Sequence, residues 1–275
     1  MSGTRGARKL SRALTRIIVI LTMGYVLVCL ALAFAQRSFI YPAPEGRGDT
    51  PSGFERVTYS TADGLELQAG YRVAQAGMPT ILYLHGNGAD WQSSVVATDR
   101  LVPEGFGVLA AEYRGYRGNP GSPSERGFYT DGEAAIDFLA AHGVESKQLV
   151  IIGNSIGSGV ATEMAKRHHP HSLVLISPFT SLPDVVAEKF WWVPARLLVQ
   201  DQFDNLAKLP AIDAPVLILH GEADRLIPDH HGRQLAVAAR TATLCLFPEA
   251  GHDLAWKREA GIAVLDFLEK LHDQD

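Results

Sequence analysis

Five residues, Gly153-Asn154-Ser155-Ile156-Gly157, have the types and the spacing to carry nucleophilic chemistry. An apolar run at 149–152 precedes them, and a stretch rich in small residues follows at 158–165. This order predicts a strand, a sharp turn at Ser155 and then a helix, the context in which Gly-x-Ser-x-Gly forms a nucleophile elbow. The helix would point its first amides at the negative charge that develops in acyl transfer. The alternative is an ordinary glycine-rich turn between strand and helix.

A serine hydroxyl needs a base, and that base needs a group to orient it. Asp224 follows a predicted buried strand within 214–221, where a carboxylate just beyond the carboxyl end of a parallel strand is expected. Glu222 is the second choice, and a solvated turn carrying two acids is the alternative. His252 follows the next predicted strand, at 243–247. We therefore predict Asp224 as the orienting acid and His252 as the base.

The other histidines among the ten in the chain are interpreted as surface or core residues. His168, His169 and His171 cluster near the end of a predicted helix, but no cysteine or acidic residue at ligand spacing accompanies them. His230 and His231 are expected to begin a surface helix. The sequence therefore predicts neither a metal site nor a cofactor.

A second loop could supply hydrogen-bond donors to the reaction. An apolar run at 81–84 leads into His85-Gly86-Asn87-Gly88, whose small residues would let backbone N–H groups turn inward. An oxyanion hole needs one donor from such a loop and another from the residue after the nucleophile. We predict the amides of Asn87 and Ile156 as these donors. Alone, the loop pattern is that of a turn; its place two strands ahead of Ser155 favours the functional interpretation.

With these motifs, the chain resembles serine hydrolases of the α/β-hydrolase superfamily, and most closely the membrane-anchored α/β-hydrolase-domain proteins. The likeness covers about residues 54–272. The motifs that carry it are His85-Gly86-Asn87, Tyr113-Arg114-Gly115-Tyr116, residues 118–125, Asp131-Gly132-Glu133, Gly153 to Gly157, Ser177-Pro178-Phe179, His220 to Asp224 and Gly251-His252. The resemblance implies Ser155 as nucleophile, Asp224 as acid and His252 as base. Relatives include acyl-protein depalmitoylases and serine aminopeptidase-like hydrolases, so a substrate does not follow from it.

The remaining sequence must supply the elements that position these residues. With 275 residues and 47% apolar content, the chain can bury one large core. Strand-like and helix-like segments alternate, which predicts an α/β fold with a mostly parallel central sheet and helices on both faces. Segments 55–60 and 65–71, around Asp63-Gly64, predict an antiparallel hairpin. Strands are expected at 71–73, 80–84, 107–111, 148–152, 173–176, 216–219 and 243–247, and helices near 91–103, 130–142, 156–168, 230–240 and 253–271.

Residues 179–213 interrupt this alternation with three prolines and the aromatic run Phe190-Trp191-Trp192. We expect a short cap over the carboxyl ends of the sheet. In it, Phe179, Phe190, Trp191 and Trp192 would line an apolar pocket for an acyl chain or another apolar group. The alternative is that these aromatics only pack the cap onto the body.

The N-terminal region predicts where the enzyme domain resides. Residues 1–16 hold five basic residues and no acid, and 19 uncharged residues follow, from Ile17 to Ala35. We predict a basic cytoplasmic N-terminus at 1–16, a transmembrane helix or uncleaved signal anchor at 17–36, a tether at 37–53 and a hydrolase domain at 54–275 outside the cytoplasm. Secretion after signal-peptide cleavage following Ala35 is the alternative.

Charge and cysteine content limit the classes of partner that the chain is expected to bind and the disulfides that it is expected to form. The net charge of −5 leaves −10 on residues 17–275 once the five basic residues are set aside, which argues against nucleic acid. The two cysteines predict no internal disulfide. The expected partners are the membrane and a small-molecule or acyl substrate, and no oligomeric state is predicted.

We predict a serine hydrolase that cleaves ester or thioester bonds, with amides as a further option, through an acyl-enzyme on Ser155. The alternatives are a catalytically silent binding module and a cytosol-facing acyl-protein thioesterase.

Overall fold

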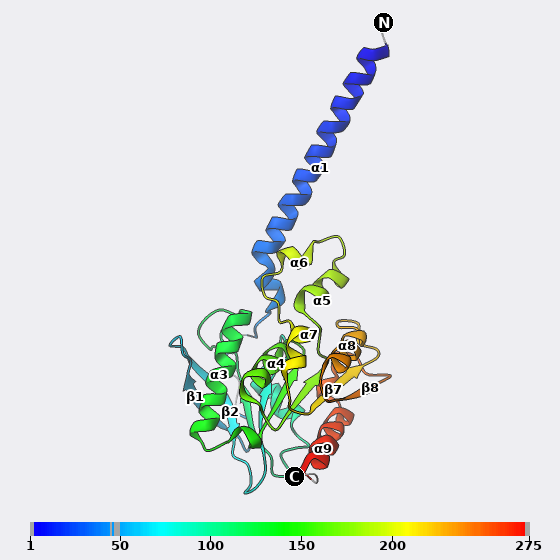
Figure 1. Cartoon of the computed structure of the whole chain (residues 1–275). Coiled ribbons are helices and arrows are strands. Elements are labelled where there is room, and N and C mark those ends of the chain that lie inside the picture. Colours follow the sequence, from blue (N-terminus) through cyan, green and yellow to red (C-terminus); the bar gives the residue numbers. More distant parts are fainter. Residues whose placement is uncertain (1–2, 45, 47–49, 273–275) are drawn as a thin grey trace.

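A computed structural model describes the backbone of residues 3–44, 46 and 50–272, with side chains from residue 12 onward within those ranges. One long helix leads into a sheet covered by helices on both faces (Figure 1). The elements in chain order are α1 (Gly3–Ile40), β1 (Glu55–Ser60), β2 (Glu66–Arg72), β3 (Thr80–Leu84), α2 (Trp91–Ala97), β4 (Gly107–Ala111), α3 (Glu125–Ala141), η1 (Ser146–Gln148), β5 (Leu149–Asn154), α4 (Ile156–His168), β6 (Ser172–Ile176), α5 (Leu182–Lys189), α6 (Ala195–Leu198), α7 (Asn205–Lys208), η2 (Leu209–Ala211), β7 (Val216–Gly221), α8 (His230–Ala238), β8 (Ala242–Phe247), η3 (Leu254–Trp256) and α9 (Arg258–His272).

The eight strands form a single sheet in the order β1-β2-β4-β3-β5-β6-β7-β8. Strands β3 to β8 run parallel to one another, and β1 and β2 form the antiparallel hairpin at one edge. Gly64 closes that hairpin with a φ of 86°, a conformation that glycine adopts without strain. The predicted mostly parallel sheet and the predicted hairpin are both confirmed.

The core has two layers, one on each face of the sheet. Successive side chains of β5 alternate between them, because neighbouring residues of a strand face opposite ways. Val150 and Ile152 join the layer under α2 and α9, whereas Ile151 joins the layer under α3 and α4. Since both faces are apolar and covered, the sheet is a firm base for the loops at its carboxyl ends.

Several element bounds differ from those predicted. Helix α3 begins at Glu125, five residues earlier than expected, because the Ser124 side chain accepts a hydrogen bond from the Gly127 amide and caps it. The helix expected near 253–271 is divided into η3 and α9. The strand expected at 71–73 is the end of β2.

Helix α1 is longer at both ends than the predicted 17–36 segment. Arginine, lysine and leucine favour helix, and the first proline after the helix start is Pro42. The start of the predicted tether therefore belongs to α1. The tether next packs on the body, because Tyr41 is buried and its hydroxyl donates to Asp201 at 2.8 Å. Its residues 45 and 47–49 lie outside the described part, as do the side chains of residues 1–11.

Between β6 and β7, residues 179–213 hold α5, α6, α7 and η2, and α5 and α6 lie beside the lower part of α1 (Figure 1). The hydroxyl of Tyr25 donates to the Trp192 carbonyl at 2.8 Å. Further along α1, the Gln36 side chain donates to the Leu198 carbonyl at 3.1 Å and accepts from the Gln200 amide at 2.9 Å. Helix α1 and this segment therefore pack along each other.

Candidate active site

Ser155 occupies a strained turn between β5 and α4. Its φ of 52° and ψ of −118° are uncommon for a residue with a side chain. A Cβ added at Gly153 would lie 2.5 Å from the Gly157 carbonyl oxygen, and one added at Gly157 would overlap the Leu84 carbonyl. Glycine is therefore required on both sides of the turn, which projects Ser155 beyond the end of the sheet.

The structure brings Ser155, His252 and Asp224 together from three loops. Ser155 follows β5, Asp224 follows β7 and His252 follows β8. His252 Nε2 lies 2.9 Å from Ser155 Oγ, and His252 Nδ1 lies 2.7 Å from Asp224 Oδ2. Because the Asp224 carboxylate only accepts, Nδ1 carries the proton and Nε2 can accept the proton of Ser155. The three side chains form a continuous chain of hydrogen bonds.

Asp224 is buried and well supplied with donors. Its Oδ1 accepts from the Leu226 amide at 2.8 Å and from the Ile227 amide at 2.9 Å. Burial opposes ionisation of this carboxyl most strongly, but the bond from His252 and these two amides together outweigh burial and hold the Asp224 pKa below its ordinary value. Glu222 instead accepts from Arg233 at 2.9 Å. The geometry therefore places Asp224, and not Glu222, against His252.

The loop after β3 passes directly beside Ser155. In the sheet, β4 lies on one side of β3 and β5, the strand that follows β4 in the chain, lies on the other. This loop therefore lies at the topological switch point, where open α/β sheets bind ligands. A Cβ added at Gly86 would lie 3.4 Å from the Ser155 Cβ. Among the described residues, no acceptor pairs with the backbone amides of Asn87 or Ile156. Two unpaired donors, one of them at the start of α4, therefore accompany Ser155.

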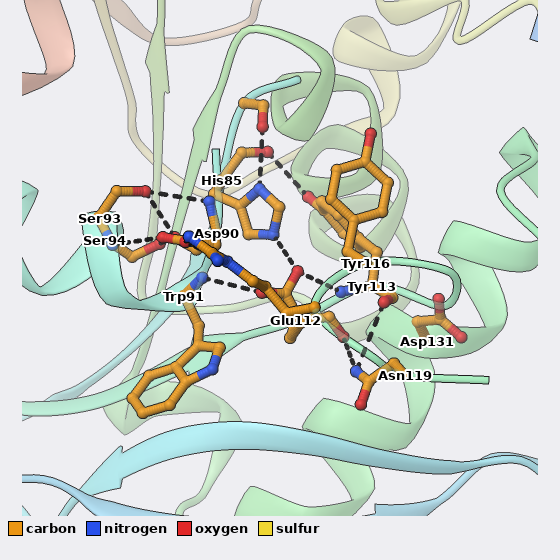
Figure 2. A network of polar contacts seen from close by, with 12 residues as sticks. His85, Asp90, Trp91, Ser93, Ser94, Glu112, Tyr113, Tyr116, Asn119 and Asp131 are labelled. Carbon is orange, nitrogen blue, oxygen red and sulfur yellow. Dashed lines mark hydrogen bonds and ion pairs between the residues drawn. The ribbon is translucent and has the colours of Figure 1, made fainter. Parts of the chain in front are cut away.

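A buried pair that the sequence did not predict holds this loop (Figure 2). His85 Nε2 lies 2.7 Å from Glu112 Oε1, and both side chains are 1% exposed. Glu112 also accepts from the backbone amides of Trp91 and Tyr113, each at 3.1 Å. The Tyr113 hydroxyl donates to the His85 carbonyl at 3.1 Å. The end of β4 is therefore fastened to the loop after β3.

Both ring nitrogens of His85 face acceptors, since Nδ1 lies 2.9 Å from the Gly86 carbonyl oxygen. Burial alone would lower the His85 pKa, but the charge and hydrogen bond of Glu112 and the Gly86 carbonyl raise it above its ordinary value. Acceptors at both ring nitrogens therefore favour the protonated form of His85. The one sequence signal for this pair was an acid, Glu112, directly after the wholly apolar strand 107–111.

The four aromatics predicted for a substrate pocket occupy different environments. Phe179 is buried at 2% exposure, after β6. Phe190 and Trp192 line a groove against α1, and Trp191 is 85% exposed. The structure thus places Phe190 and Trp192, in the turn between α5 and α6, beside α1. Their role in holding a substrate stays a prediction.

One group of three side chains in the described part of the chain has atoms close enough to hold a metal ion. Atoms of Glu188, His230 and His231 lie within 4.8 Å of one another. The Thr180 amide donates to His231 Nδ1 at 3.2 Å, so Nε2 of the neutral ring carries the proton and offers no lone pair. This donor set does not fit a metal. Of the histidines near the end of α4, His168 contacts Glu133 at 2.6 Å, and His169 ends the helix in a left-handed conformation.

Comparisons with known proteins show which proteins the chain is similar to. The sequence model of the Alpha/beta hydrolase family matches residues 81–202. An uncharacterized protein of Mycobacterium tuberculosis is 34% identical over 227 residues, which cover 79% of this chain and 80% of that protein. A lysophosphatidylserine lipase of Xenopus tropicalis is 32% identical over 201 residues, which cover 65% of this chain and 51% of that protein.

Among solved structures, a bacterial membrane phospholipase A is similar with a TM-score of 0.62. The similarity covers 98% of this chain and 99% of that one, at 20% sequence identity. At that identity the likeness shows a shared fold.

Proposed function

The chain belongs to the α/β-hydrolase family, as its motifs predicted, and we propose that it is a serine hydrolase of ester or thioester bonds. The observation that carries the proposal is the hydrogen-bonded chain Asp224–His252–Ser155, at 2.7 and 2.9 Å. The names of two similar proteins, a lipase and a phospholipase, favour carboxylic esters.

In the proposed reaction, Ser155 Oγ attacks the substrate carbonyl carbon while His252 Nε2 takes its proton. The carbonyl oxygen becomes an oxyanion, which the Asn87 and Ile156 amides stabilise. His252 then gives the proton to the alcohol or thiol, which departs. The acyl group stays bonded to Ser155 Oγ. His252 then takes a proton from water as the water oxygen attacks the acyl carbonyl carbon. It returns that proton to Ser155 Oγ as the acid product leaves. Asp224 keeps Nδ1 protonated and stabilises the imidazolium.

We further propose that α1 anchors the enzyme in a membrane with its N-terminus in the cytoplasm. Within α1, residues Arg12–Ile40 are long and apolar enough to cross a membrane. Apolar side chains such as Leu21, Leu27 and Phe34 are 67%, 63% and 94% exposed, which suits lipid and not water. The basic residues ahead of the span favour this orientation. Cleavage after Ala35 would remove Tyr25, which contacts the cap, and this favours the anchor over secretion.

The proposal is tested by replacing the nucleophile. Ser155→Ala should lower kcat for p-nitrophenyl esters on the order of 10⁴-fold or more, because no other group forms the acyl-enzyme. It should also abolish labelling by a fluorophosphonate probe. Ser146→Ala, on the exposed η1 turn at the opposite end of β5, is the matched control and should retain full activity. An unlabelled, inactive wild-type protein would support the silent binding module instead.

A further inference from the structure

An apolar groove of about 390 Å³ lies between α1 and the cap helices. Eleven of its twelve lining residues are apolar, and the exception is Gln36, whose side chain is already paired with the cap. Six of the lining residues come from α1, among them Leu32, Ala33 and Ile40, and six come from the cap, among them Phe190 and Trp192. Its volume falls in the range of roughly 300–1,000 Å³ typical of small-molecule sites.

The groove lies at the depth of the proposed membrane span. Tyr25, which bonds the Trp192 carbonyl, precedes Gln36 by 11 residues, and 11 helical residues extend about 16 Å. The cap turn therefore reaches well into the apolar part of α1. In the cap segment along this stretch of α1, Trp191 and Leu197 are 85% and 86% exposed. Exposed aromatic and aliphatic side chains at this level meet lipid, as in proteins that lie in one leaflet.

One residue that lines the groove, Ile40, contacts the loop that passes beside Ser155. Ile40 lines the groove, and its carbonyl accepts from the side-chain amide of Asn87. The Tyr116 hydroxyl donates to the Asn87 side-chain oxygen at 2.8 Å, which fixes the other end of that amide. Asn87 follows Gly86, which passes against Ser155. A residue of the groove lining is thus in direct contact with Asn87, whose backbone amide is the proposed oxyanion donor.

We propose that this groove holds the acyl chain of a membrane-lipid ester, which enters from the leaflet beside α1 and places its carbonyl at Ser155. The inference rests on the proposed hydrolase function and on the proposed anchor. An acyl chain that moves from the leaflet into this groove stays in apolar surroundings, so its transfer does not expose apolar surface to water. Half of the lining comes from α1, so the anchor is part of the substrate site.

The test fills the groove in the full-length protein reconstituted in phospholipid nanodiscs. Ala33→Trp puts an indole into the groove, and Ala31→Trp, at an exposed position of α1 outside the lining, is the matched control. We expect Ala33→Trp to lower kcat/KM for p-nitrophenyl esters of 12 to 16 carbons on the order of tenfold or more, as loss of apolar pocket contacts does. Hydrolysis of the two-carbon ester should change less than about twofold, since that acyl group does not reach the groove. Ala31→Trp should match wild type with both.

Leu32→Ala widens the groove, and it keeps the test conclusive if Ala33→Trp fails to fold. It should move the preferred acyl chain to greater length while Ser155 keeps its rate of labelling by a short-chain fluorophosphonate. Unchanged chain-length profiles in Ala33→Trp and Leu32→Ala, with the short ester still hydrolysed, would overturn the groove but leave the hydrolase intact. Absence of all ester hydrolysis and labelling in wild type would overturn the hydrolase itself.

Discussion

The tautomer of His252 is fixed by its two neighbours. The Asp224 carboxylate has no proton to give, so it requires the Nδ1 proton of His252 at 2.7 Å. That requirement leaves Nε2 to accept from Ser155 at 2.9 Å. An amide at position 224 would present an N–H group to Nδ1 and favour the opposite tautomer, with Nε2 protonated against Ser155.

Asp224→Asn should therefore lower kcat by about 10³- to 10⁴-fold, because the base is held in the wrong tautomer. Glu222→Gln should cost far less, since Glu222 pairs with Arg233 on the surface. Steady-state kinetics on a short p-nitrophenyl ester measures both. A reversed order of the two losses would identify Glu222 as the acid.

At the scale of elements, the pattern of the sequence predicted the strands in their chain order but not the contacts between the loops that follow them. Each catalytic candidate directly follows a strand whose apolar run is visible in the sequence, so the meeting of Ser155, Asp224 and His252 could be expected from topology. Glu112 and His85 are 27 residues apart and follow different strands. Their pairing depends on the lateral order β4-β3, which no local pattern reveals.

Glu112→Gln should misplace the loop after β3. The uncharged amide no longer stabilises the protonated ring, and it offers one acceptor oxygen in place of two. One of the donors now bonded to Glu112 therefore loses its partner, at a cost of about 1–3 kcal/mol in stability. We expect kcat to fall roughly tenfold to a hundredfold through the displaced Asn87 amide, with KM nearly unchanged. Glu104→Gln, an exposed acid ahead of β4, is the control. A variant that loses stability but keeps kcat would reduce the pair to a structural role.

The same pair predicts how stability depends on pH. The folded-state pKa of His85 is raised, so its contribution is complete below the unfolded value of about 6.5 and is lost as pH rises through the folded pKa. The wild-type denaturation midpoint in urea should decline over that window above pH 6.5. Glu112→Gln should decline less. Equal slopes for the two proteins would show that His85 is neutral when folded.

At the scale of the whole molecule, the part of α1 from Tyr25 onward packs against the cap segment. Composition showed that residues 17–36 could span a membrane, because length and apolarity are local properties. It could not show which side of an apolar helix faces lipid and which faces protein, since both surfaces favour the same residue types. The contacts of Tyr25, Gln36 and Tyr41 with the cap segment therefore emerge only in three dimensions.

The anchor and its orientation can be measured together in cells. A reporter fused after Asp275 should respond as a protein outside the cytoplasm, because five basic residues precede the span and hold the N-terminus inside. The protein should stay with membranes through an alkaline carbonate wash, since a helix of this apolarity does not leave lipid. A soluble form that begins at Gln36 would establish secretion instead. A cytoplasmic C-terminus would reverse the orientation, place Ser155 at the cytosolic leaflet and favour the acyl-protein thioesterase.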